Sequence, residues 1–150
     1  MKIEDEIKQE KFTSEYQKLV VNLLYTSGWI TSKNSEFLKV HKLTSQQFNI
    51  LRILRGQYPN PATVNLLIER MLDKMSNASR IVDRLVAKKL AERKSCPADR
   101  RRVDIIISDK GMKLLEKIDL DEKLWNKKFE NLSLKEAKTL NNYLDKLRGN

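Results

Sequence analysis

The feature that most constrains this chain is a switch from helical to strand periodicity between residues 76 and 108. Over residues 76–89, apolar side chains recur at helical spacing. Further on, Val103, Ile105 and Ile107 alternate as in a half-buried strand, with Asp104 on the other side. Three arginines, Arg100–Arg102, lie between the two patterns. The sequence therefore predicts an amphipathic helix followed directly by a hairpin with arginines at its tip.

A second helix is expected just before this one. Asn60 can cap it and Pro61 fits its first helical position, where the missing N–H costs nothing. Ser76 is the expected cap of the following helix, which we extend to about Lys89. The expected buried positions are Val64, Leu67, Ile68 and Met71 in the first helix, and Ala78, Ile81, Val82 and Leu85 in the second. The expected outward positions in the second are Asn77, Ser79, Arg80, Arg84 and Lys88. Two helices joined by a short turn, the second with a polar and basic outer face, form a helix-turn-helix.

Capping residues mark the helices on either side. Thr44 and Gln47 can form a capping box at one helix start, and Gly56 is the expected stop of that helix. After the hairpin, Ser108 can cap a helix over residues 110–131. The expected strands around the arginines are residues 90–96 and 102–108.

The two ends of the chain are helical and carry apolar stripes. A first helix is expected over residues 14–31, interrupted near Gly28 and followed by a short helical piece over residues 36–39. Ser133 and Glu136 form a capping box for the last helix. The stripes comprise Tyr16, Leu19, Val20, Leu23, Leu24, Trp29 and Ile30 at one end, and Leu134, Ala137, Leu140, Leu144 and Leu147 at the other. The fold class is therefore mainly α with a small β hairpin.

Charge indicates the kind of partner. The 150 residues carry a formal charge of +10, and residues 73–102 alone hold ten basic and four acidic side chains. Such a patch favours a polyanion, either nucleic acid or a membrane surface, and composition alone does not choose between them. The single cysteine, Cys96, excludes an intramolecular disulfide and fits a reducing compartment. With no apolar signal core or spanning segment, we expect a cytoplasmic protein that does not enter a membrane.

No catalytic or metal-binding pattern is apparent in the sequence. One histidine and one cysteine cannot supply a four-ligand zinc site, and four glycines form no phosphate-binding loop. We therefore expect neither an enzyme nor a cofactor or metal.

The stretch SRIVDRLVAKKLAERKSCPADRRRVDIIISDKG, residues 79–111, resembles the recognition helix and wing of the multiple antibiotic resistance regulator (MarR) family of winged helix-turn-helix transcription factors. The wing pattern of that family is D-x-R-x-x-x-V-x-L-T-x-x-G. Its positions are filled here by Asp99, Arg101, Ile105, Ile107, Ser108 and Gly111. The helix order fits the whole chain, with motif-level similarity over residues 44–111. Where the family usually has glycine after the recognition helix, this chain has Lys89, which would need a left-handed or otherwise adapted backbone.

The resemblance implies a single MarR-like domain over residues 1–150. Residues 1–42 and 112–150 would be dimerisation helices, and residues 43–111 the winged helix-turn-helix lobe. It also implies a homodimer that binds double-stranded DNA sequence-specifically, most simply a repressor on a palindromic operator with half-sites about 34 Å apart. A small effector that releases the DNA is left open.

Residue roles follow from the same resemblance and from side-chain chemistry. The expected DNA-binding residues are Ser76, Asn77, Ser79, Arg80, Arg84 and Lys88 on the recognition helix, and Asp99, Arg100, Arg101 and Arg102 on the wing. Arg101 would enter the minor groove, oriented by Asp99. Arg80 would meet a base edge, although a salt bridge to Asp83 or Asp73 is an alternative.

Other features carry two interpretations. Trp29 and His41 could line an effector pocket, or belong to the core together with Trp125. Cys96 could sense oxidants, but its place on the wing favours a structural role. Two other functions also remain: an architectural binder without sequence preference, and a helical adaptor whose basic patch meets an acidic protein.

Overall fold

The computed structural model describes residues 2–96 and 99–149, with the backbone alone for residues 95–96, 99–102 and 122–124. The elements are α1 (Ile3–Ile7), α2 (Glu15–Lys39), α3 (Ser45–Gln57), β1 (Ala62–Thr63), α4 (Val64–Arg70), α5 (Ala78–Ala87), β2 (Ala91–Cys96), β3 (Asp99–Ile107), α6 (Asp109–Asn126), the 3-10 turn η1 (Lys127–Phe129) and α7 (Leu134–Leu147). The strands form one antiparallel sheet in the order β1-β3-β2. The predicted class, mainly α with a small β wing, is confirmed.

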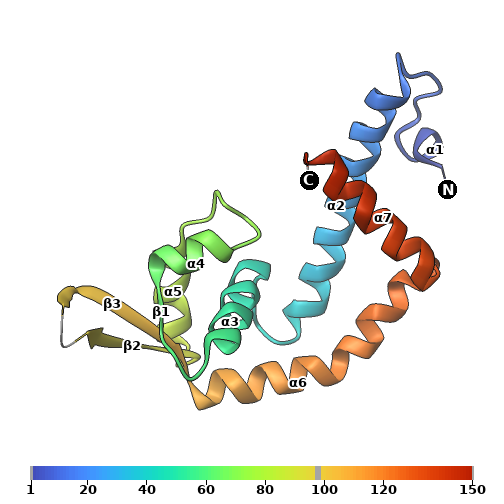
Figure 1. The fold of residues 1–150 in the computed structure, drawn as a ribbon. Helices are drawn as coiled ribbons and strands as arrows, with labels where there is room; N and C mark the ends of the chain where they lie inside the picture. Colours follow the sequence, from blue (N-terminus) through green and yellow to red (C-terminus); the bar gives the residue numbers. More distant parts are fainter. Residues whose placement is uncertain (1, 97–98, 150) are drawn as a thin grey trace.

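The chain forms a lobe and an arm (Figure 1). The lobe contains α3, α4, α5 and the sheet, whereas α2 and α6 extend away from it and α7 continues the arm beyond α6. The core of fully buried apolar side chains lies in the lobe and includes Leu38 from the end of α2 and Leu115 and Ile118 from the first half of α6. The arm is therefore anchored to the lobe by one end of each long helix.

Helix α2 runs unbroken through Gly28, so the predicted interruption is wrong. One glycine inside a helix costs only about 1 kcal/mol relative to alanine, which a 25-residue helix tolerates. The helix begins where the Ser14 hydroxyl accepts a hydrogen bond from the Gln17 N–H at 3.1 Å. Helix α1, which the sequence did not predict, is tied to α2 by the Tyr25 hydroxyl, which donates to Glu6 Oε2 at 2.6 Å.

Helix α3 begins with the predicted capping box. The Thr44 hydroxyl accepts from the Gln47 N–H at 3.2 Å, and Gln47 Oε1 accepts from the Thr44 N–H at 3.3 Å. The predicted stop at Gly56 is wrong, because the helix includes Gly56 and Gln57 before Tyr58 ends it.

The predicted start of the next helix at Asn60 and Pro61 is also wrong. Residues 62 and 63 are extended, since they pair with β3 through Ala62 opposite Ile105 and Thr63 opposite Asp104. Thr63 then caps α4, its hydroxyl accepting from the Leu66 N–H at 3.2 Å. The predicted buried face is right for Leu67 and Met71, whereas Ile68 is exposed.

The hairpin is present, but its arginines are not in the connection. Strand β3 begins at Asp99, so the backbone of Arg100–Arg102 belongs to the strand, next to an irregularity in its pairing with β2. The predicted alternation is wrong for Val103, which is exposed, and for Asp104, which is only 9% exposed. The reason is that β3 is the central strand, with Asp104 paired between Thr63 of β1 and Lys94 of β2.

The C-terminal helices follow the predicted caps. Ser108 Oγ accepts from the Gly111 N–H at 3.0 Å at the start of α6, and Ser133 and Glu136 form the capping box of α7. Helix α6 ends at Asn126, earlier than predicted, where the 3-10 turn begins.

Candidate nucleic-acid interface

Helix α5 presents the polar and basic face that the sequence predicts. Its cap is Asn77 and not Ser76, because Asn77 Oδ1 accepts from the Arg80 N–H at 3.0 Å. The Ser76 hydroxyl instead donates to Asp73 Oδ2 at 2.6 Å. This bond, with a second from the Met75 N–H, lowers the pKa of the Asp73 carboxyl. The turn between α4 and α5 is thereby held by its own polar groups.

The two faces of α5 are sharply different. Ala78, Val82 and Leu85 are buried in the core of the lobe, whereas the predicted outward residues are all exposed. These are Asn77, Ser79, Arg80, Arg84 and Lys88. The helix therefore presents a polar and basic surface whose position is fixed by a fully packed opposite side.

Arg80 does not form the salt bridge that was its alternative. Asp83 pairs with Arg93 of β2, and Asp73 is bonded within its own turn. Within the described part of the chain, no side chain pairs with the guanidinium of Arg80 or Arg84. Two arginines on one helix face, four residues apart, are thus available to an external anion.

A shallow cleft of about 310 Å³ separates this face from the start of α3. Its lining comprises Thr44, Gln46, Gln47, Ser76, Asn77, Arg80, Ile81 and Arg84. The sequence analysis missed Thr44 and Gln46 as part of this surface. The capping box located the start of α3, but nothing local in the sequence placed that helix end beside α5.

The ammonium group of Lys88 makes two hydrogen bonds inside the lobe. Its ammonium donates to the Lys42 carbonyl at 2.6 Å and to Gln47 Oε1 at 3.0 Å. Gln47 is only 3% exposed, so Lys88 joins the end of α5 to the start of α3. Of the predicted recognition-helix residues, Lys88 alone has its charged group bonded across the lobe.

The predicted wing site lies partly outside the described residues. The side chains of Cys96, Asp99, Arg100, Arg101 and Arg102 are not described, and only the course of their backbone along β2 and β3 is given.

Trp29 and His41, predicted to line an effector pocket, belong to one aromatic cluster. The cluster comprises Trp29, Phe37, His41, Trp125 and Phe129. The Trp29 and Phe129 ring centroids lie 6.0 Å apart, and those of Phe37 and Trp125 lie 5.4 Å apart. The His41 side chain is only 4% exposed, with Nε2 3.3 Å from Asp121 Oδ2.

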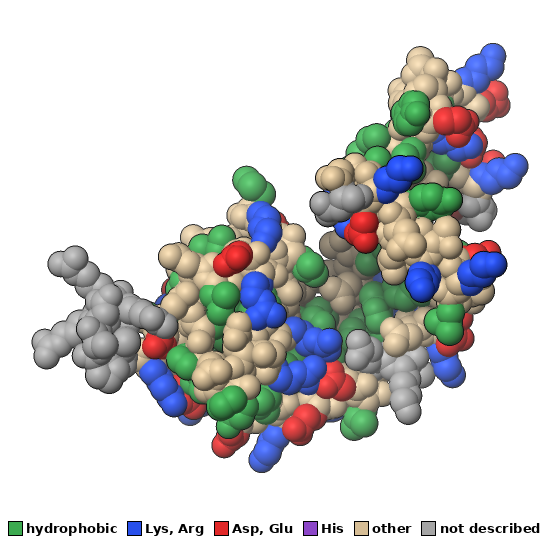
Figure 2. Space-filling model, viewed as in Figure 1, with side chains coloured by type: hydrophobic (Ala, Val, Ile, Leu, Met, Phe, Trp, Pro, Cys, Tyr) green, Lys and Arg blue, Asp and Glu red, His purple; other side chains and the backbone are tan. Residues whose placement is uncertain are grey.

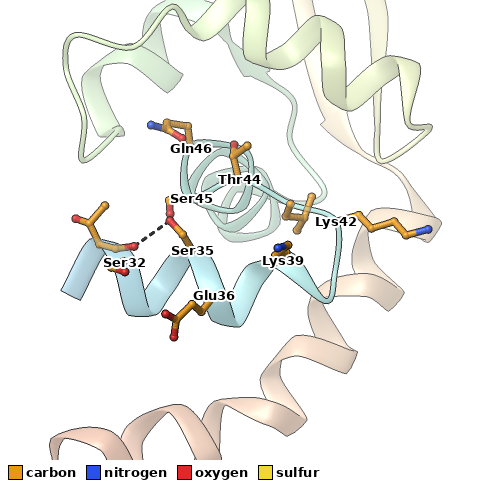
Figure 3. A pocket seen from close by; sticks show the side chains of 10 residues that line it. Ser32, Ser35, Glu36, Lys39, Lys42, Thr44, Ser45 and Gln46 are labelled. Atoms are coloured by element: carbon orange, nitrogen blue, oxygen red, sulfur yellow. Dashed lines mark hydrogen bonds between the residues drawn. The ribbon is translucent and has the colours of Figure 1, made fainter. Parts of the chain in front are cut away.

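A more voluminous cleft than the one beside α5 lies elsewhere (Figure 3). It encloses about 670 Å³ between the second half of α2 and the start of α3, and neither Trp29 nor His41 lines it. Trp29 borders a smaller cleft of about 350 Å³ together with Tyr25 and Ile3.

The fold is that of a winged helix-turn-helix protein. It has a three-helix lobe with a buried core, a three-stranded sheet that forms the wing, and a helix, α5, whose outer face is exposed and basic. Residues 41–102 match the family model described as MarR family. This segment is therefore similar to the MarR family of transcription regulators, and the whole chain has the fold of solved structures from that family.

Solved structures share the fold over nearly the whole chain. The chain is 25% identical to the MarR transcription factor from Planctomyces limnophilus, with a TM-score of 0.69 over 90% of this chain and 98% of that one. It is 24% identical to a MarR variant from E. coli complexed with operator DNA, with a TM-score of 0.79 over 92% and 99%. It is 22% identical to Bordetella bronchiseptica BpsR, in work on regulation of DNA binding by 6-hydroxynicotinic acid, with a TM-score of 0.72 over 87% and 98%. No curated protein matches the chain.

None of the described helices combines the length and apolar character needed to cross a membrane. Among the described residues, no three or more His, Cys, Asp or Glu side chains gather as metal ligands would.

Proposed function

We propose that this chain is a dimeric repressor of transcription that binds a palindromic operator in double-stranded DNA. The observation that carries the proposal is the outer face of α5, where Arg80 and Arg84 have no partner among the described residues while the opposite face is fully buried. A rigid helix with exposed arginines suits the major groove, because arginine can make paired bonds to guanine.

Each residue of the face has a role in the proposal. Ser79 and Arg80 meet base edges, and Arg84 meets a phosphate. Ser76 and Lys88 are also assigned to the DNA backbone, Lys88 through the donor that its bonds to the scaffold leave over. Asn77 uses its carbonyl oxygen as the helix cap, so only its amide N–H groups are left for a base.

In this proposal the wing and helix α5 together form the part of each lobe that contacts DNA, which we call the reading head. Arg101 enters the minor groove beside the recognition helix, Asp99 orients it, and Arg100 and Arg102 bind flanking phosphates. Residues 43–111 are thus the DNA-binding lobe.

Dimerisation is assigned to residues 1–42 and 112–150. The arm exposes large apolar side chains that a monomer would leave in water: Tyr16, Leu19, Val20, Leu24, Trp29 and Ile30 on α2, and Leu134, Leu140, Tyr143 and Leu147 on α7. Green side chains are scattered over the arm in Figure 2. This number of exposed large apolar side chains on two helices is typical of a protein interface. A two-fold pair of chains would present two winged lobes to one palindrome.

A small-molecule effector is the remaining part of the proposal. The Bordetella relative, whose DNA binding is regulated by 6-hydroxynicotinic acid, supports it by analogy. In this chain the candidate effector site is the aromatic cluster that contains Trp29 and His41, because it lies between the two long helices of the arm. Binding there would change the angle of the head and release the operator in the cytoplasm.

The test is selection of bound duplexes from a random library, repeated at two salt concentrations. Enrichment of one palindrome, bound by two copies of the chain, would support the proposal. Tight binding without sequence preference, with an affinity that falls steeply as salt is added, would replace it with the architectural function. If the chain shows no such salt-dependent binding to duplex DNA, the helical adaptor is favoured.

A further inference from the structure

Helix α6 leaves the core of the lobe at one residue. Leu115 and Ile118 are 0% and 1% exposed and belong to the core cluster of the lobe. Ile118 is the last residue of α6 in that cluster. Asp119 therefore lies where the helix passes from the lobe into the arm, which is the point where a bend would change the angle between them.

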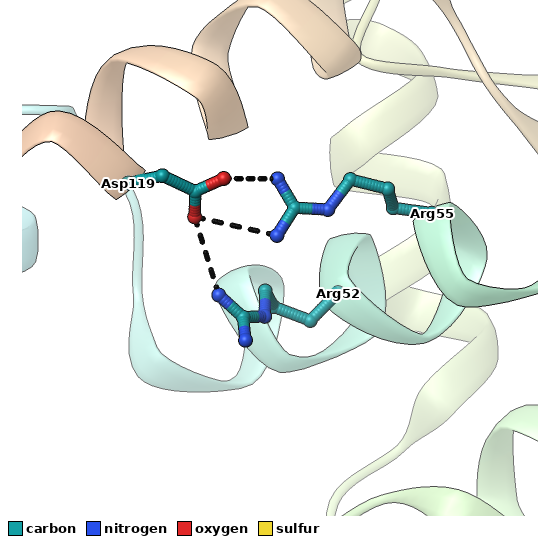
Figure 4. A network of polar contacts seen from close by, with 3 residues as sticks. All are labelled: Arg52, Arg55 and Asp119. Atoms are coloured by element: carbon teal, nitrogen blue, oxygen red, sulfur yellow. Dashed lines mark hydrogen bonds and ion pairs between the residues drawn. The ribbon is translucent and has the colours of Figure 1, made fainter. Parts of the chain in front are cut away.

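At this point the Asp119 carboxylate holds two arginines of α3 (Figure 4). Arg55 Nη1 donates to Oδ2 at 2.5 Å and Arg55 Nη2 donates to Oδ1 at 3.3 Å, so the pair is two-pronged. Arg52 Nη1 donates to Oδ1, also at 3.3 Å. Two-pronged arginine–carboxylate pairs fix direction as well as distance. We call these three residues the Asp119 clamp.

The arginines are themselves held in place. The guanidinium of Arg52 lies over the Phe48 ring, 5.8 Å from its centroid, and α3 carries Ile50, Leu51 and Leu54 into the core. The clamp thus joins α3, which is packed into the core of the lobe, to the first turn of α6 beyond the core.

A second contact braces α6 from the side of α2. His41, which follows α2, has Nε2 3.3 Å from Asp121 Oδ2, and Phe37 of α2 packs on Trp125 of α6. These contacts join α6 to α2 and do not involve α3. The polar contacts that fix the angle between α6 and α3 are therefore those of the clamp.

We propose that the Asp119 clamp sets the angle between the winged lobe and the arm, and through it the separation of the two reading heads in the dimer. This inference rests on the proposed function, because only a dimer that reads two half-sites has a head separation. Asp119, Arg52 and Arg55 are positioning residues that do not touch DNA. An intact clamp makes the dimer selective for one spacing of half-sites, whereas a loosened clamp accepts several spacings and binds the best one less tightly.

The experiment compares full-length variants on the selected palindrome. Asp119→Asn keeps the size of the side chain and removes the charge, Asp119→Glu restores the charge, and Arg55→Met removes the two-pronged partner. Glu36→Gln is the matched control, because it breaks an exposed ion pair with Lys33 inside a single helix. Affinities are measured for duplexes whose half-site spacing changes by one base pair at a time, and for a duplex with a single half-site.

For Asp119→Asn and Arg55→Met we expect a flattened spacing profile, an affinity at the best spacing lower by on the order of tenfold, and an unchanged affinity for the single half-site. Asp119→Glu and Glu36→Gln should keep the profile of the unaltered protein. An unchanged profile in Asp119→Asn and Arg55→Met, or an equal loss on every duplex including the single half-site, would overturn the inference. If the unaltered protein itself shows no preferred spacing, the dimeric function fails first, and that result is distinct because it appears before any variant is compared.

Discussion

The hydroxyl of Ser108 donates a hydrogen bond to the carbonyl oxygen of Lys89 at 2.8 Å, which ties the start of α6 to the residue that turns the chain out of α5. Lys89 has a φ of 60°, in the left-handed region that side chains other than glycine adopt at a cost. Of the two conformations expected at Lys89, left-handed or otherwise adapted, the structure has the left-handed one. The joint between recognition helix, wing and α6 is built on a strained backbone.

Replacing Lys89 with glycine should stabilise the protein. The left-handed conformation costs a residue with a side chain about 1–2 kcal/mol. Glycine removes this cost, but it loses more conformational freedom when the chain folds, which offsets part of the gain. We expect the free energy of unfolding to rise by about 0.5–1 kcal/mol, measured by denaturant titration. Lys89→Ala is the control, since it removes the same charge without relieving the backbone. An equal gain in both variants would assign the effect to charge.

Gly111, the last position of the family wing pattern, should not tolerate a side chain. A Cβ there would lie 2.2 Å from the Leu90 carbonyl oxygen and 2.8 Å from Ile107 Cγ1. We expect Gly111→Ala to lower the free energy of unfolding by about 1–3 kcal/mol, the usual cost of overpacking. Gly56→Ala is the matched control, because that helical glycine has nothing within 4 Å and should stabilise by about 1 kcal/mol. Calorimetric melting of both variants checks the opposite signs.

Helix starts were predicted well where the sequence contains a capping box. The capping boxes at Thr44 and Ser133 are made by residues three apart, so a short window of sequence contains all of the interaction. The start at Asn60 and Pro61 was wrong because Ala62 and Thr63 pair with a strand some forty residues later in the chain. No pattern among neighbouring residues predicts that pairing.

The candidate site shows the same division. The exposed face of α5 and the burial of Ala78, Val82 and Leu85 follow from helical spacing and were predicted correctly, whereas Ile81 is only partly buried. The partners of its charged groups were not predicted, because Asp83 takes Arg93 from β2 and Lys88 reaches Lys42 and Gln47 at the start of α3. These bonds depend on how the hairpin and α3 pack against α5, which a single sequence does not show.

The capping box of α7 should make helix stability depend on the protonation of the Glu136 carboxyl. The pKa of the Glu136 carboxyl is lowered from its ordinary value of 4.5, first by the Ser133 hydroxyl and then by the Ser133 N–H. A carboxyl whose pKa is lowered by folding stabilises the protein above its ordinary pKa, and this contribution is lost as pH falls through the lowered value. In Ser133→Ala the pKa of Glu136 should move back toward 4.5, followed by carboxyl chemical shifts in NMR. Thr139→Ala, on the same helix but outside the box, should leave the Glu136 pKa where it is.

A charge placed on the apolar stripe of α7 should dissociate the proposed dimer. Leu140 is 45% exposed in the single chain, so Leu140→Glu should leave the fold intact. Two-fold symmetry would bury two such charges at one interface, and we expect the dimer dissociation constant to rise on the order of 100-fold. Sedimentation over a range of concentrations measures it. Ile68→Glu, on α4 in the lobe where the side chain is 43% exposed, is the control and should remain as dimeric as the unaltered protein. Equal dissociation of both variants would remove the interface from α7.

Arg80 and Arg84 should affect DNA binding in different ways, although both project from one face of α5. Arg80 lies in the first turn, where a recognition helix meets base edges. Arg80→Ala should therefore cost about 1–3 kcal/mol and relax the preference at one position of each half-site. Arg84→Ala should weaken binding to all duplexes alike and reduce the salt dependence by about one phosphate contact per subunit. Arg148→Ala removes the same charge from an ion pair on the distant end of α7 and should change neither quantity. Full affinity and unchanged sequence preference in both α5 variants would show that this face does not read DNA.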